Sequence, residues 1–169
     1  MKNTLSRRFA FLTIATLSLS ALTGCAAGPN ASTRLITQVT DGVEGESGAV
    51  KLRNFTLVLQ PDNSVVLVGT VVNQDEIDDA VLAIGINGER AKLWANGGEV
   101  ESLPLTLNRP QTLAGPSATA YAYLEQFDVK PGYRAPVEVI LQRGGIVELD
   151  VIVRERDLEF SDVSLPISN

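Results

Sequence analysis

The hydrophobic and polar positions of this chain follow the two-residue period of β-strands over most of its length. The clearest strand pair comprises residues 137–141 and 146–153, two alternating runs on either side of Gly144-Gly145, a dipeptide that favours a tight hairpin turn. Residues 65–72 are β-branched and almost continuously apolar, as expected of a central strand or a strand in a sandwich core. The pattern predicts further strands at residues 35–39, 49–59, 80–86, 91–94, 99–107 and 117–127.

Turn signals separate these strands at regular spacing. Residues 61–64 (Pro-Asp-Asn-Ser) and the Asn96-Gly97-Gly98 tripeptide are typical of turns. The alternation within residues 49–59 changes phase near Asn54, which predicts a β-bulge. No stretch of ten or more residues has a convincing helical stripe. About eight or nine short strands joined in this way predict an all-β fold, an antiparallel sandwich of the Greek-key type.

The first 24 residues have a different pattern. A basic start with Lys2, Arg7 and Arg8 precedes an apolar stretch at residues 9–22, which is short and rich in Thr and Ser compared with a membrane span of roughly 20 residues. This arrangement is typical of a bacterial export signal that is later removed. Arg7-Arg8 is also similar to a twin-arginine signal, but Ala10 stands where that pattern has a bulky apolar residue. Both export routes stay open.

Leu22-Thr23-Gly24-Cys25 closes this segment and contains the only cysteine of the chain. The tetrapeptide resembles the lipobox of bacterial lipoproteins, which implies diacylglyceryl transfer to the Cys25 sulfur and cleavage before that residue. Two or more acyl chains anchor a protein stably, whereas one chain binds only marginally. We therefore predict that Cys25 is lipidated and holds the protein at the cell membrane, on its extracytoplasmic side. An ordinary signal peptide with an incidental cysteine is the alternative.

The predicted cleavage leaves a chain long enough for one domain with a single core. We expect residues 1–24 to be the signal peptide and residues 25–33, which lack apolar periodicity, to be the lipidated N-terminus and a flexible tether. The sandwich domain is predicted at residues 34–160, and residues 161–169 are expected to form a C-terminal tail.

The mature chain is strongly acidic. Removal of the signal leaves eleven Lys and Arg residues against twenty Asp and Glu residues, a net charge of −9. Phosphates and anionic lipid headgroups repel such a surface. The charge therefore predicts no nucleic-acid partner and no domain lying flat on lipid, which leaves the acyl groups on Cys25 as the membrane contact.

Several stretches occur in an order that points to a known family. Residues 71–82 form a strand, an acidic turn and a strand, and residues 113–116 (Leu-Ala-Gly-Pro) precede the strand at 117–127; Lys130-Pro131-Gly132 precedes the closing hairpin. This order resembles the cupredoxin-like periplasmic copper chaperones over roughly residues 51–153. The resemblance implies an immunoglobulin-like or cupredoxin-like sandwich. With the lipobox-like segment added, the chain is similar to the LpqE-like envelope lipoproteins of actinobacteria.

The copper function of that family does not carry over to these residues. The family binds copper through His and Met, ligands that suit Cu(I) and Cu(II), but this chain has no His and its one Met is Met1. In the strand where the family places ligands, the chain has Ala118, Ala120, Tyr121, Ala122 and Tyr123. We therefore predict no metal and no cofactor. The lack of His also removes most enzyme designs, so we predict a non-catalytic protein.

Three further features have more than one interpretation. The acidic turn with Asp75, Glu76, Asp78 and Asp79 is a tentative contact for a partner or a hard cation, although a solvated turn is favoured. Trp94 is either an anchor for a partner or, as favoured, a core residue beneath a hairpin. The pair Tyr121 and Tyr123 either stacks on a sugar or peptide or, as favoured, covers the sandwich edge.

These observations predict a cell-envelope lipoprotein whose domain binds or assembles with an unknown envelope protein or ligand. Two alternatives remain from the residues alone: a divergent copper chaperone, and a hydrolase that uses only carboxylates.

Overall fold

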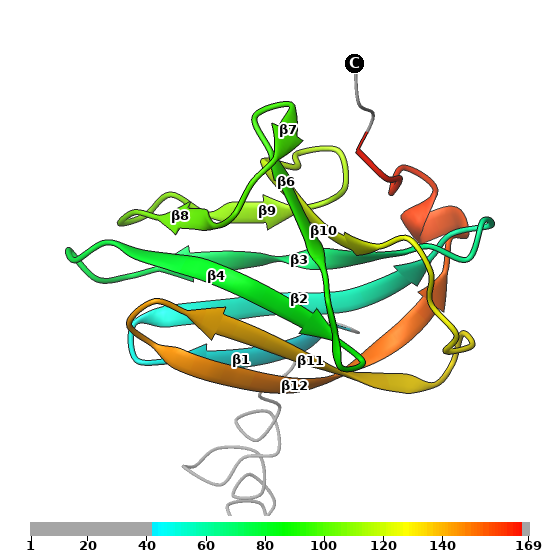
Figure 1. Ribbon diagram of the computed structural model, residues 1–169, viewed down its shortest axis with the longest axis horizontal. Helices are drawn as coiled ribbons and strands as arrows, with labels where there is room; N and C mark the ends of the chain where they lie inside the picture. Colours follow the sequence, from blue (N-terminus) through cyan, green and yellow to red (C-terminus); the bar gives the residue numbers. More distant parts are fainter. Residues whose placement is uncertain (1–41, 167–169) are drawn as a thin grey trace, which may run out of the picture. The chain divides into compact units, whose positions relative to one another are not determined.

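The computed structural model describes residues 42–166, whose regular structure consists almost entirely of β-strands (Figure 1). The predicted export signal, Cys25, the tether and the predicted strand at residues 35–39 lie outside this range. Within residues 42–166 no helix is long and apolar enough to cross a membrane.

Twelve strands and one short 3-10 helix follow one another along the described chain. They are β1 (Val43–Ser47), β2 (Val50–Leu59), β3 (Val65–Asn73), β4 (Asp79–Ile86), β5 (Glu89–Arg90), β6 (Lys92–Ala95), β7 (Gly98–Glu99), β8 (Leu103–Leu105), β9 (Gln111–Leu113), β10 (Ala120–Leu124), β11 (Arg134–Leu141), β12 (Gly145–Glu155) and η1 (Leu158–Phe160).

The strands form one strongly curled sheet in the order β5-β4-β11-β12-β2-β3-β9-β10-β6-β7, with β1 added to β2 and β8 added to β4. The long strand β12 joins the two layers of the curl, because it pairs with β11 and then, at Val153–Glu155, with β2. Most pairs are antiparallel, and the β12–β2 and β10–β9 pairs are parallel. The structure confirms the predicted all-β, mostly antiparallel fold.

Local turn chemistry explains the features that the pattern predicted correctly. β11 and β12 form the expected hairpin, in which Leu141 pairs with Gly145 and Gly145 has a φ of 74°. The predicted bulge is present, because the β2–β3 register shifts between Arg53 and Thr56 and Asn54 has a φ of 57°. Asn is one of the few residues other than Gly that adopt this left-handed conformation readily.

Other predicted strands are divided or shortened. The run at residues 99–107 is not one strand, since β7 ends at Glu99 and β8 begins at Leu103 and pairs with β4. β8 leaves the β6–β7 hairpin because its two leucines, both fully buried, point into the core from the opposite layer. The strand expected at 117–127 is shorter in the structure, where it consists of β10 alone. The short strands β1, β5 and β9 were not predicted.

Two apolar clusters stabilise the sheet. The main core fills the space between the two layers, and its largest fully buried side chains include Phe55, Leu57, Leu67 and Ile84. A second, smaller cluster lies on the other face of β2 and β3, where it contains Val58, Val66, Ala114 and Val163. Val163 is 4% exposed, so part of the segment expected as a C-terminal tail packs on the sheet.

Candidate functional site

The turn between β3 and β4, which carries the predicted acidic contact, is organised by Asn73. This residue is 1% exposed, and its amide nitrogen donates to the carbonyl oxygens of Ile77 at 2.8 Å and Leu105 at 3.1 Å. Its amide oxygen accepts a hydrogen bond from the backbone N–H of Asp75 at 2.9 Å. One short side chain with donors and an acceptor therefore shapes the turn and ties it to β8.

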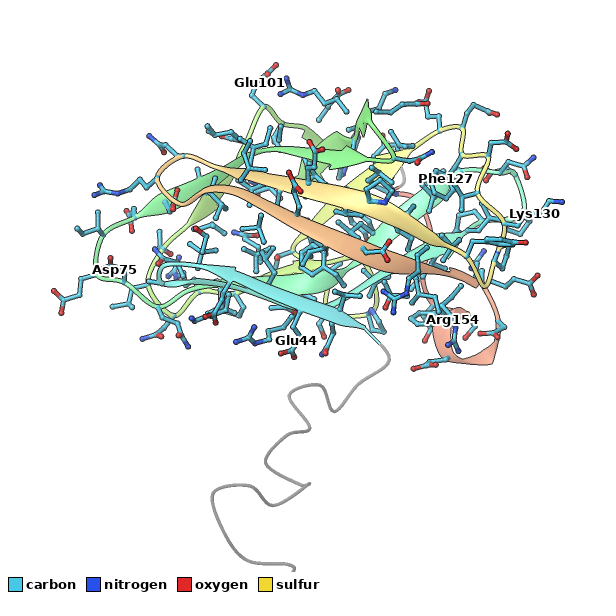
Figure 2. All side chains as sticks on the ribbon, turned by 90° about the horizontal axis from the view of Figure 1, so that it is seen from below. Glu44, Asp75, Glu101, Phe127, Lys130 and Arg154 are labelled. Carbon is cyan, nitrogen blue, oxygen red and sulfur yellow. The ribbon has the colours of Figure 1, made fainter. Side chains whose placement is uncertain are left out.

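The four acidic residues of the turn do not converge. Asp75, Glu76 and Asp78 are exposed, and Figure 2 shows Asp75 pointing away from one end of the molecule. Asp79 is 8% exposed, and its carboxylate accepts hydrogen bonds from the backbone N–H groups of Ala80 and Arg143. Across residues 42–166 no three His, Cys, Asp or Glu side chains gather in a way that would hold a metal ion. The role of this turn as a partner contact stays a prediction.

Strand β10 presents two chemically different faces. Ala120 and Ala122 are fully buried and belong to the main core. Tyr121 and Tyr123 alternate with them, are partly exposed, and pack against the second cluster on the opposite face. This agrees with the expectation that the tyrosines cover the sandwich. The methyl groups of these two alanines, which face the core, offer no donor atom to a metal.

The prediction that Trp94 packs in the core is wrong. Its neighbour Leu93 points into the core and is 4% exposed, whereas Trp94 is partly exposed and therefore lies on the outer side of β6. The register places Trp94 directly opposite Tyr121 on β10, and such directly paired side chains are close enough to touch. We call Trp94, Tyr121 and Tyr123 the aromatic face.

An ion pair borders the aromatic face. Lys92 lies opposite Tyr123 in the β6–β10 register, and its ammonium group contacts the Glu125 carboxylate at 2.5 Å. The hydrogen bond to Glu125 raises the pKa of Lys92, and burial raises the pKa of the Tyr123 hydroxyl. At neutral pH this border therefore carries a paired cation and anion beside a neutral phenol.

The C-terminal segment packs in the cluster beneath the two tyrosines of the aromatic face. The guanidinium group of Arg156 donates two hydrogen bonds to the carbonyl oxygen of Ser161, at 3.2 and 2.8 Å, and the backbone N–H of Val163 donates to the carbonyl of Phe160. These bonds hold Val163 in the second cluster, against which Tyr121 and Tyr123 also pack. The tyrosines thus have one side on protein and one side toward solvent.

Sequence reasoning missed the pairing between the two strands of the aromatic face. Alternation places Tyr121 and Tyr123 on one side of β10, but the register between β6 and β10 alone brings Trp94 beside Tyr121 and Lys92 beside Tyr123. The Asn96-Gly97 turn, with φ values of 54° and 82°, indicates the β6–β7 hairpin that the structure shows, and no local signal indicates the pairing of β6 with β10.

Comparisons with known proteins support the fold. No family model matches the sequence, and neither does any curated protein. Solved structures of PCuAC domains are similar. The copper-bound PCuAC domain from PmoF2 is 18% identical, covers 67% of this chain and 98% of its own, and has a TM-score of 0.57. The apo PmoF2 PCuAC domain is 17% identical over 69% of this chain and 98% of its own, with a TM-score of 0.59.

A third structure gives the same result. The apo PCuAC domain from PmoF1 is 17% identical, covers 67% of this chain and 99% of its own, and has a TM-score of 0.58. At this level of identity the likeness concerns the fold. The described domain therefore has the cupredoxin-like β fold of PCuAC domains, as the sequence resemblance implied.

Proposed function

We propose that this protein is a lipid-anchored, extracytoplasmic envelope protein whose PCuAC-like domain binds another envelope component without catalysing a reaction. The sequence supports the anchor through the basic start, the apolar stretch and the Leu22-Thr23-Gly24-Cys25 segment. The resemblance of the sequence to the LpqE-like envelope lipoproteins also supports this proposal. The fold is compatible with it, since a domain that buries its own core needs the lipid only for attachment.

Copper transfer is the less favoured function for this fold. One of the similar PCuAC domains, that from PmoF2, is copper-bound. The present chain contains no His, and its one methionine is Met1. The residues of β10 that resemble the family's ligand strand are buried alanines and partly exposed tyrosines. Phenol and methyl groups do not replace the imidazole and thioether ligands that copper prefers.

The aromatic face is the observation that most directly supports a partner contact. Trp94 and Tyr121 lie side by side on the outer side of the sheet, and both keep part of their surface exposed. Tyr and Trp are enriched where proteins bind partners, because they supply a large contact area with few rotatable bonds. We assign the contact with the envelope partner to this face.

Photocrosslinking in intact cells tests the contact. A benzophenone amino acid replaces Tyr121 in one variant and, as a control, Glu148 in another; Glu148 is exposed on β12 in the opposite layer. We expect a specific adduct from position 121 that position 148 does not give. The additional change Trp94→Ala should reduce the yield at position 121. Equal adducts from both positions, or none from position 121, would contradict the assignment.

The anchor has a separate test. Mass spectrometry of the protein isolated from its native membrane should find residues 1–24 absent and the Cys25 sulfur acylated. An unmodified Cys25, or a chain that keeps residues 1–24, would refute the anchoring part of the proposal without affecting the partner contact.

A further inference from the structure

A pocket opens at the end of the sandwich opposite the acidic turn. Figure 2 labels Phe127, one of its lining residues, near this end and Asp75 at the other. Three connections border the pocket: the β2–β3 turn, the β4–β5 turn and the loop that follows β10. Its volume is about 370 Å³, within the range of roughly 300–1,000 Å³ found for small-molecule sites.

The apolar lining of the pocket belongs to the main core. Ile86, Leu124 and Phe127 are 0%, 7% and 9% exposed and pack with the core residues of both layers. Because neighbouring core side chains hold them in place, they form a fixed apolar floor, of which Leu124 and the Phe127 ring expose only a small edge.

The polar lining comes from five exposed side chains: Asn63, Asn87, Glu89, Gln126 and Asp128. None of these side chains forms a hydrogen bond or an ion pair with another residue of the described range 42–166. Their hydrogen-bonding groups therefore remain open to a ligand. In the loop after β10 the exposed residues Gln126 and Asp128 precede and follow the buried Phe127, so polar groups lie beside the apolar floor of the pocket.

The composition of this lining selects a class of ligand. No Lys or Arg lines the pocket, so a phosphate or carboxylate ligand would meet two carboxylates without a compensating cation. A purely apolar ligand would desolvate five polar side chains and give them no partner. Three amides and two carboxylates supply donors and acceptors next to each other, which matches hydroxyl groups that both donate and accept.

We infer that this pocket binds the ring of a carbohydrate without acidic groups. The hydroxyl groups of one edge of the sugar pair with the amides and carboxylates, and the apolar C–H face of the sugar ring lies over the exposed edges of Phe127 and Leu124. None of the lining residues belongs to the aromatic face, so the inference stands independently of the proposed partner contact.

Ligand-observed saturation-transfer NMR tests the inference on the full chain, purified in a detergent without a sugar headgroup. The probes are methyl glucoside, methyl galactoside, methyl mannoside and N-acetylglucosamine at millimolar concentration. We expect saturation of the ring protons of at least one probe. The double variant Gln126→Ala, Asp128→Ala should bind that probe about tenfold more weakly or worse, a loss of about 1.4 kcal/mol.

The control is a second double variant, Gln142→Ala, Asp162→Ala, which removes the same two residue types from exposed positions outside the pocket. It should bind the sugar like the unchanged protein. Circular dichroism verifies that both variants fold. No saturation of any of the four probes, or equal saturation with and without Gln126 and Asp128, would overturn the inference. Binding of spermidine in place of every sugar would also overturn it and would indicate a site for cationic amines.

Discussion

Replacing Asn73 by alanine tests whether one buried amide holds the β3–β4 turn against β8. The change removes the donors to the carbonyls of Ile77 and Leu105 and the acceptor of the Asp75 N–H. It leaves the apolar core untouched, since Asn73 is a polar residue at the end of its strand. Any loss of stability therefore reports the hydrogen bonds together with the small space that the shorter side chain leaves.

The magnitude follows from where the abandoned partners lie. The bond to Leu105 is buried, so its carbonyl loses its partner out of reach of water, at a cost of about 1–3 kcal/mol. The groups of Ile77 and Asp75 belong to the exposed turn and regain water, so each costs only about 0.5–1.5 kcal/mol. The free energy of unfolding should fall by about 2–6 kcal/mol, a large part of the roughly 5–15 kcal/mol typical of a domain.

Urea unfolding followed by the fluorescence of Trp94, the single tryptophan, measures the effect. With a slope of about 2 kcal/mol per molar urea, the midpoint of Asn73→Ala should fall by about 1–3 M. Gln74→Ala, at the adjacent exposed position, is the control and should keep the original midpoint. A shift below about 0.3 M for Asn73→Ala would show that other groups satisfy the turn, and the reasoning would be wrong.

Three further predictions concern the anchor, the second cluster and pH. Cys25→Ala should abolish incorporation of radiolabelled fatty acid into the protein; labelling that persists would contradict the lipid anchor. Val163→Ala should lower the free energy of unfolding by about 1–2 kcal/mol in urea, and an unchanged midpoint would contradict packing of the C-terminal segment. Hydrogen bonds from the hydroxyl and backbone N–H of Ser64 lower the pKa of Asp62. The ionised carboxylate therefore stabilises the fold above pH ~4, and this contribution is lost as the pH falls through the lowered pKa. Asp62→Ala should reduce the urea midpoint at pH 7 and no longer do so once both states are protonated; a difference that persists there would have another cause.

Local signals predicted the individual strands and turns well. Gly144-Gly145 marked the β11–β12 hairpin, and the phase change at Asn54 marked the bulge of β2. Each of these features depends on residues that are neighbours in the sequence, since alternation and turn conformation are properties of a few consecutive residues. The lack of His was equally visible, because it is a matter of composition alone, and it removed the imidazole ligands that copper prefers.

The pairing of distant strands was not predictable in the same way. The pattern of residues 99–107 does not reveal that β7 pairs with β6 while β8 pairs with β4. Trp94 was placed in the core from its position beside a hairpin, but the side of the sheet on which it lies depends on the register with β10. A shift of one residue would exchange the two faces.

The short β-strands, the acidic composition and the lack of His follow from the sequence alone. These are consequences of local pattern and composition. Which side chains come together depends on the fold: Trp94 lies beside Tyr121 on the aromatic face, and Asn63, Asn87 and Gln126 lie around one pocket. The curl of the sheet brings these groups together from separate strands and turns, and it results from the packing of the whole core.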